Sequence, residues 1–284
     1  MNTLRKFALR GRSGECSGFT LVELLVVIAT VAVLSAVLLP ALAGTRANGQ
    51  AFQCQNNMRR LTLGWLMYQG DNNDKLMEYK RWVYGVMDWS SSFQNADTTY
   101  ITATNTMATY IKSAEVYKCP ADVYQSSANR GPRVRSVSLN GTLDGGTGAG
   151  PTKVNQNGRT YFEARKVYDL NTPGPAQIFV ILDEHPDSIN DGAFMLDAGL
   201  FPPQEYWRDF PASHHNGAGS LSFADGHTEI HRWMEQQNRP VKISTVLPVL
   251  YQNYATRTDS PWGKPILSYD KDYEWVNDRM PYRA

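Results

Sequence analysis

Three side chains near residue 230 follow the spacing that would place metal-binding groups on one face of a β-strand. His227, Glu229 and His231 are each two residues apart. Successive side chains of a strand point to opposite faces, so these three share one face. Imidazole nitrogens and carboxylate oxygens on a shared face can ligate a metal ion. A solvated strand face without a ligand fits the same spacing, and both interpretations stay open.

Other candidate ligands lie outside this strand. His215 precedes it, and residues 183–191 form the acidic segment DEHPDSIND. The carboxylates favour Ca²⁺ and the histidines favour Zn²⁺ as a possible cofactor, although the sequence requires neither. The candidate metal ligands are Asp183, Glu184, His215, His227, Glu229 and His231.

The sequence lacks the motifs of common enzymes. Residues 212–220 bring serine and histidine together, but no glycine-flanked serine elbow is present. No glycine-rich phosphate loop precedes a predicted helix. The net charge of +1 does not indicate a basic surface for nucleic acid. We therefore expect neither an enzyme nor a nucleic-acid-binding protein.

The N-terminal region carries the strongest structural pattern. Residues 19–43 are apolar apart from Glu23 and, at ~1.5 Å per residue, would extend about 37 Å, enough to cross a bilayer. Residues 1–18 hold four basic side chains against one acidic side chain, a net charge of +3. A positive leader before an apolar helix predicts a cytoplasmic N-terminus and export of the chain beyond the helix.

The pattern then changes from uniformly apolar to amphipathic. Beyond Pro40, apolar residues recur at three- and four-residue steps through Trp65, which predicts that the helix continues to about residue 69. In the remainder, residues 81–89 read as a strand and residues 176–184 as a buried strand.

A β-hairpin is expected around Asp225 and Gly226. An Asp-Gly pair between alternating runs is typical of a two-residue type I′ turn. That turn would pair Ser222 with Glu229 and Leu221 with Ile230, and would place the side chains of Leu221 and Ile230 in the core.

The residues GFTLVE, Gly18 to Glu23, together with the apolar helix through Pro40, resemble the processing site of type IV prepilins and type II secretion pseudopilins. The resemblance implies cleavage between Gly18 and Phe19 by a membrane-embedded prepilin peptidase, followed by N-methylation of Phe19. It also implies that Glu23 pairs with the terminal amino group of a neighbouring subunit, which would explain a carboxylate in lipid. In a plain signal anchor, Glu23 would instead reach the interface.

A second resemblance to known proteins lies in the chain beyond the N-terminal helix. His215, nine intervening residues, and then Asp225-Gly226, together with YKCPAD at residues 117–122, look like a subfamily of pilin-like proteins. This similarity implies a family and no particular activity.

The resemblance implies an α+β, pilin-like fold. We expect a leader at residues 1–18, a transmembrane helix at 19–43, an amphipathic continuation at 44–70 and an exported globular head at 71–284. The expected function is a structural subunit of a pilus-like or pseudopilus filament. Its expected partners are prepilin peptidase, other pilin-like subunits and inner-membrane lipid. The expected location is the inner membrane, with a single span and the head in the periplasm or outside the cell. The alternative is a membrane-anchored exported binding domain, for example for glycans.

Two cysteines come after the expected cleavage site. Cys54 lies on the amphipathic helix and Cys119 precedes a proline. Because an exported domain meets an oxidising environment, we predict a Cys54–Cys119 disulfide. Closing a loop of ~65 residues would contribute roughly 4 kcal/mol. Two separated free thiols are the alternative.

Overall fold

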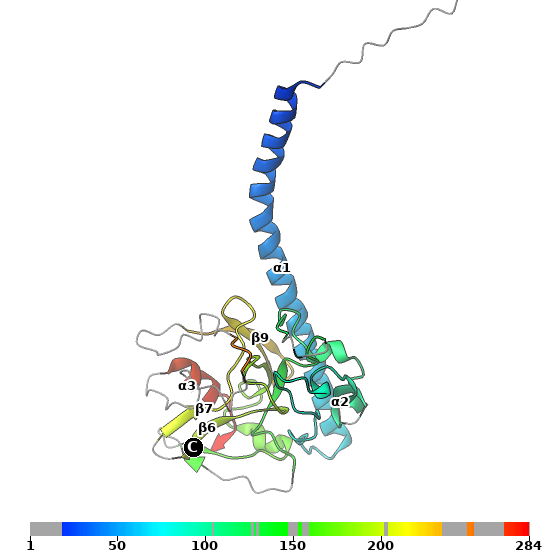
Figure 1. Ribbon diagram of the computed structural model, residues 1–284. Helices are drawn as coiled ribbons and strands as arrows, with labels where there is room; N and C mark the ends of the chain where they lie inside the picture. Colours follow the sequence, from blue (N-terminus) through cyan, green and yellow to red (C-terminus); the bar gives the residue numbers. More distant parts are fainter. Residues whose placement is uncertain are drawn as a thin grey trace, which may run out of the picture. The chain divides into compact units, whose positions relative to one another are not determined.

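The computed structural model describes residues 19–103, 105–125, 128, 131–146, 153–154, 159–201, 204–234, 249–252 and 270–283. The chain divides into two compact units, Met1–Arg46 and Ala47–Ala284, and each is described by itself. The expected leader, including Gly18, lies outside the described residues. Figure 1 shows the ribbon.

Helix α1, Leu21–Asp71, dominates the N-terminal part of the chain. Its ends lie within two residues of the bounds that the sequence predicts, and Pro40 lies inside it. The α1 residues of the first unit expose large apolar side chains, among them Leu25, Ile28 and Leu34. The long N-terminal apolar helix followed by a mixed α+β domain is therefore confirmed as a layout.

The second unit is built on a five-stranded sheet with the order β5-β1-β4-β8-β9. Only the β1–β5 pair in this sheet is parallel, so the sheet is mixed. Its strands are β1 (Val137–Asn140), β4 (Phe179–Asp183), β5 (Ala193–Phe194), β8 (Ala218–Phe223) and β9 (Thr228–Arg232). The central strand β4 is buried along its whole length, as its sequence predicts.

Both faces of the sheet are covered. Residues of α1 pack on one face with Leu139 and Ile181. On the other face, Leu182 and Phe223 pack in a cluster that includes residues of helix α3, Lys271–Asn277. In Figure 1, α3 and α1 lie on opposite sides of β9. A sheet covered on both faces explains why its inner strands are apolar rather than alternating.

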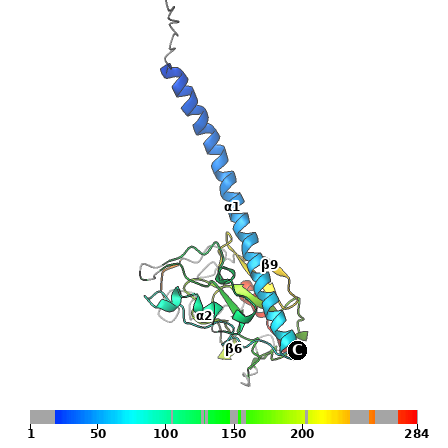
Figure 2. The ribbon, with the colours of Figure 1, turned by 90° about the vertical axis from the view of Figure 1, so that its right-hand side faces the viewer.

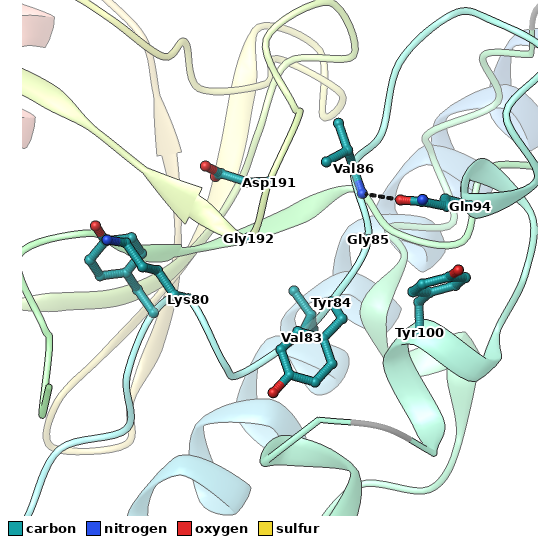
Figure 3. A pocket seen from close by; sticks show the side chains of 10 residues that line it. Lys80, Val83, Tyr84, Gly85, Val86, Gln94, Tyr100, Asp191 and Gly192 are labelled. Atoms are coloured by element: carbon teal, nitrogen blue, oxygen red, sulfur yellow. Dashed lines mark hydrogen bonds between the residues drawn. The ribbon is translucent and has the colours of Figure 1, made fainter.

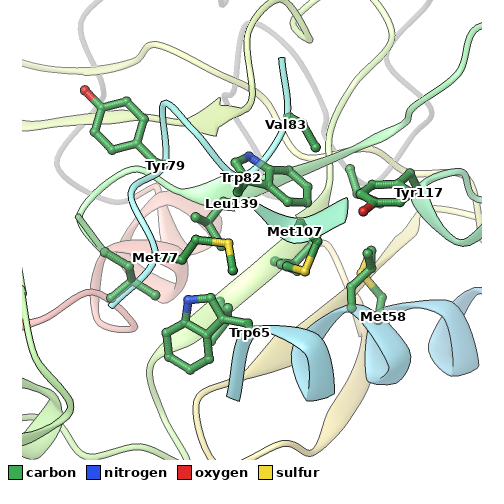
Figure 4. Packing of buried hydrophobic residues seen from close by; sticks show 14 of the residues in the cluster. Met58, Trp65, Met77, Tyr79, Trp82, Val83, Met107, Tyr117 and Leu139 are labelled. Carbon is green, nitrogen blue, oxygen red and sulfur yellow. The ribbon is translucent and has the colours of Figure 1, made fainter. Parts of the chain in front are cut away.

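The α1 side of the core contains large aromatic and sulfur-containing side chains. Figure 4 shows Trp65 on α1 pointing toward Met77 and Leu139, with Trp82 above them. Met58, on the same helix, points toward Tyr117. Met58 and Trp65 are seven residues apart, so they lie on the same face of the helix. This face, which also carries Cys54 and Leu61, fastens the second half of α1 to the head.

Smaller elements complete the described part of the head. Strands β10, β3 and β2 form one small sheet, and β6 and β7 form a hairpin. Figure 2 shows the second view of these elements. Their bounds are Lys153–Val154 (β2), Thr160–Tyr161 (β3), Leu196–Phe201 (β6), Gln204–Trp207 (β7), Tyr282–Arg283 (β10), Thr99–Thr102 (α2), and the 3₁₀ turns Phe93–Asn95, Met107–Thr109, Ala114–Tyr117 and Val167–Asn171.

The predicted β8–β9 hairpin is present, but its predicted register is wrong by one residue. Ser222 pairs with Thr228 rather than with Glu229. The amide of Phe223 donates to the carbonyl of His227, so three residues form the turn, with Gly226 at φ +94°. A three-residue turn that ends in a left-handed glycine is the next most common hairpin after the two-residue form.

The strand expected at residues 81–89 is also wrong. The segment is irregular, and its backbone bonds go to α2 and to a loop: Tyr84 N donates to Tyr100 O and Met87 N to Asn190 O. Gly85 adopts φ +87°, and a Cβ there would lie 3.2 Å from the Tyr100 ring. The left-handed glycine turns the chain inside a run that looks like a strand by composition.

Candidate functional site

The start of α1 contains a reciprocal capping arrangement. The backbone amide and the hydroxyl of Thr20 donate to Glu23 Oε2 over 2.8 and 2.7 Å, and Glu23 N donates to Thr20 Oγ1 over 3.2 Å. These bonds satisfy donors that a helix leaves open at its first turn. Phe19, just before the cap, is 71% exposed. The Thr-x-x-Glu spacing is visible in the sequence and predicts this cap, a role that was not among those expected for Glu23.

Helix α1 is long and apolar enough to span a membrane. From Phe19 to Thr45 its only charged side chain is Glu23. Signal sequences and core helices of soluble proteins can meet the same test, but the first part of α1 is exposed rather than buried in a protein core.

A second site lies inside the head, where four potential ligand atoms converge. They belong to Cys54, Cys119, Asp183 and His215, and all lie within 4.8 Å of one another. We call these four residues the thiol cluster. Cys54 comes from α1, Cys119 lies just after the 3₁₀ turn Ala114–Tyr117, Asp183 ends β4 and His215 precedes β8.

The contacts inside the thiol cluster are close. Cys54 Sγ donates to Asp183 Oδ2 over 3.2 Å. Cys119 Sγ lies 3.3 Å from His215 Nε2, and that nitrogen lies 3.6 Å from Asp183 Oδ2. Cys54, Cys119 and Asp183 are each 1% exposed, and the His215 side chain is 4% exposed. The cluster is therefore shut off from solvent.

Local structure explains how each side chain reaches the cluster. Asp183 lies two residues after Ile181 on β4, so both face α1. Cys54 lies four residues before Met58 on the buried face of α1. A tight loop at Asn216 and Gly217, with φ of 56° and 84°, lets His215 N donate to Ala218 O.

The charge states inside the cluster depend on one another. Burial raises the pKa of the Cys54 thiol well above its usual value, while the neighbouring Cys54 thiol lowers the pKa of Cys119. Burial alone would lower the pKa of His215, but its bonds to Asp183 and Cys119 outweigh burial and raise the pKa to about 10. The neighbours of His215 therefore favour its protonated form, and burial favours the neutral Cys54 thiol.

The geometry does not fit a nucleophilic cysteine. In a catalytic Cys–His–Asp set, the carboxylate holds the ring nitrogen opposite the one that faces the sulfur. Here Asp183 and Cys119 both approach the same nitrogen, Nε2 of His215.

The structure does not contain the predicted Cys54–Cys119 disulfide. Both residues are free, buried cysteines. The two sulfur atoms lie within 4.8 Å of each other, and each thiol makes a closer contact, to Asp183 or to His215. Their juxtaposition, which the disulfide hypothesis requires, is nevertheless present.

The predicted metal ligands separate into two groups. Asp183 and His215 join the cluster, whereas Glu184 points elsewhere and accepts hydrogen bonds from Ser138 and Ser188. Burial raises the pKa of Glu184 to about 7. Adjacent strand residues face opposite sides, so Asp183 and Glu184 do not act on one centre.

His227, Glu229 and His231 do not gather around a common centre in the described structure. His227 Nδ1 bonds to Asp225 Oδ1 at 2.6 Å, and its ring stacks on Phe223. His231 stacks on Trp275 with 3.6 Å between ring centroids. The two histidine rings are thus engaged by hydrogen bonding or stacking, and metal ligation by these three residues stays a prediction.

The residues of the motif His215…Asp225-Gly226 lie in two separate parts of the structure. His215 belongs to the thiol cluster, whereas Asp225 and Gly226 form the β8–β9 turn. Asp225 Oδ1 accepts a bond from His227 N over 3.1 Å, which fixes the turn.

A separate pocket opens on the head beside residues 81–89, with a volume of about 360 Å³. Figure 3 shows Tyr84 and Tyr100 on its wall, with Lys80 and Asp191 farther along. Gln94 is fixed there because its Oε1 accepts a bond from Val86 N over 2.7 Å. The pocket combines aromatic faces with a few polar groups, as small-ligand sites often do.

Comparisons with known proteins add no relative. The chain matches no family model, no curated protein and no solved structure.

Proposed function

We propose that this protein is a structural subunit of a type IV pilus-like or type II secretion pseudopilus filament. The observation that carries the proposal is the first part of α1: an exposed apolar helix with Glu23 as its only charge. Such a surface must be covered by lipid or by other apolar helices. A carboxylate so close to an apolar span needs a positive partner, and the amino terminus of a neighbouring subunit can supply one.

The proposed route rests on the resemblance of residues 18–23 to prepilin sites. Prepilin peptidase cuts after Gly18 and methylates Phe19. The subunit stays in the inner membrane through α1, with the head in the periplasm, until helix–helix packing adds it to a filament. The head then lies on the filament surface. In this proposal the protein has a mechanical role and carries out no catalysis.

The test is the mass of the N-terminal peptide from protein isolated from membranes, with and without an active prepilin peptidase. The expected result is a chain that starts at N-methylated Phe19 only when the peptidase is active. A peptidase variant that lacks its catalytic aspartates provides the control. A chain that keeps the leader in both samples would overturn the filament proposal.

A second candidate function is a membrane-anchored binding domain for glycans. The observation that favours it is the pocket beside residues 81–89, because exposed tyrosine rings such as Tyr84 can stack on the apolar faces of sugars. An unprocessed chain that binds polysaccharide in a pull-down would favour this function. A processed chain without glycan affinity would favour the filament.

A further inference from the structure

We propose that Cys54, Cys119, Asp183 and His215 form a structural zinc site that fastens α1 to the head. The donor set is two sulfurs, one nitrogen and one carboxylate oxygen from four separate parts of the chain. This inference stands apart from the proposed function, because it concerns the interior of the head and not the anchor.

The spacing of the ligand atoms fits a tetrahedral ion. With Zn–S near 2.3 Å and Zn–N or Zn–O near 2.0–2.1 Å, neighbouring ligands of a tetrahedron lie about 3.3–3.8 Å apart. The observed separations are 3.2 Å for Cys54 to Asp183, 3.3 Å for Cys119 to His215 and 3.6 Å for His215 to Asp183. The other three pairs lie within 4.8 Å, so side-chain shifts of up to about 1 Å would bring every pair into the tetrahedral range.

The kind of donor selects the metal. Thiolates are soft ligands that favour Zn²⁺, whereas Ca²⁺ takes six to eight oxygens. Two cysteines and a single carboxylate cannot provide an oxygen cage. Of the two cofactors that the sequence left open, the cluster therefore favours Zn²⁺.

Burial and ligand count indicate a structural role. Zinc sites that do chemistry keep one position open to water or substrate, whereas structural sites fill all four with side chains. Here four side chains are available and none is solvent-exposed. Cys54 and Asp183 are 129 residues apart, and Cys119 and His215 are 96 apart. An ion at their centre would close long loops and stabilise the fold accordingly.

The experiment measures metal and thiol state in the full chain, extracted from membranes in mild detergent and exchanged into metal-free buffer. Elemental analysis should find about one zinc ion per chain. Alkylation should label Cys54 and Cys119 only after a denaturant and a chelator are added. Cys119→Ser and His215→Ala should each lower zinc content to roughly a tenth or less. His227→Ala, a histidine outside the thiol cluster, is the matched control and should retain zinc.

A second measurement uses the wild-type chain, so that the test does not depend on the variants being able to fold. Replacement of zinc by Co²⁺ in the wild-type chain should produce thiolate-to-cobalt charge-transfer absorption together with the bands of a tetrahedral ion. Wild-type chain without zinc or cobalt uptake, or with a Cys54–Cys119 disulfide in peptide maps, would overturn the proposal. Zinc retained by both the Cys119→Ser and the His215→Ala variant would also overturn it.

Discussion

At the residue scale, the thiol cluster contains residues from two separate predictions, a metal site and a disulfide. Asp183 and His215 were candidate metal ligands, and the two cysteines were a candidate disulfide. The structure puts all four in one place. Sequence spacing could not show this, because the four residues come from a helix, a strand end and two loops. The spacing of His227, Glu229 and His231 looked more like a site, but their ligand atoms do not converge in the described part of the chain.

His231 offers a pH-dependent prediction. Burial, with a smaller contribution from Arg279, lowers the pKa of His231 to about 4 from an ordinary value of 6.5. Between these two values the unfolded chain binds a proton that the folded chain does not, so the free energy of unfolding falls as the pH falls through this window. His231→Phe keeps an aromatic ring beside Trp275 and removes the titration.

The measurement is the urea midpoint of the detergent-solubilised chain at pH 7.5 and pH 5. The wild-type midpoint should drop at pH 5, and that of His231→Phe should drop less. Met67→Ala, which removes an exposed side chain that does not titrate, should show the same drop as the wild type. An equal drop in His231→Phe and the wild type would contradict the prediction.

At the element scale, regular patterns were predictable and irregular ones were not. The apolar run and its amphipathic continuation predicted α1 to within two residues, and the run at residues 176–184 predicted β4. The β8–β9 hairpin was predicted with the wrong register, because Asp-Gly suits turns of two or three residues and only tertiary packing chooses between them. The strand predicted at residues 81–89 is absent because composition does not reveal that Gly85 adopts a left-handed backbone conformation.

The packing of α1 on the sheet gives a prediction about stability. Trp65 is fully buried between α1 and the sheet, whereas Met67 on the same helix is 59% exposed. Trp65→Ala should lower the free energy of unfolding of the head by about 3–5 kcal/mol, because it leaves a large cavity. Met67→Ala should change it by less than about 0.5 kcal/mol. Urea titration followed by far-UV circular dichroism measures both. Similar losses in the two variants would show that this face of α1 does not hold the head.

At the scale of the whole molecule, the two units differ in how far their apolar side chains are exposed. The first exposes leucine, valine and isoleucine along α1, whereas the second gathers apolar residues into two buried clusters. The first unit therefore needs an apolar surrounding that the described chain does not supply. Lipid and neighbouring copies of α1 both meet this need, which is the condition for a subunit that moves from a membrane into a filament.

Glu23→Gln tests assembly separately from folding. Glutamine can replace glutamate in the Thr20 cap, so the start of α1 should be preserved. The variant loses the charge that would pair with a neighbouring amino terminus. We expect normal cleavage and at least a roughly tenfold smaller filament fraction in sedimentation, which corresponds to about 1.4 kcal/mol.

The matched control for assembly is Thr30→Val. The Thr30 hydroxyl already bonds to Val27 O of its own helix, so its loss should not affect assembly. Filament fractions of Glu23→Gln that equal those of the wild type would contradict a pairing role for Glu23.

The buried face of α1 has a consequence for a protein under tension. Traction along α1 would reach the head through Cys54, Met58, Leu61 and Trp65, which stand in one row parallel to the helix axis. Contacts arranged in this way are loaded in shear, so they must yield together and cannot be peeled apart one by one. Trp65, the last residue of this row along the chain, would have to slide past the other buried contacts before the helix could separate from the head. The helix can thus pass traction to the head through several buried side chains that share the load.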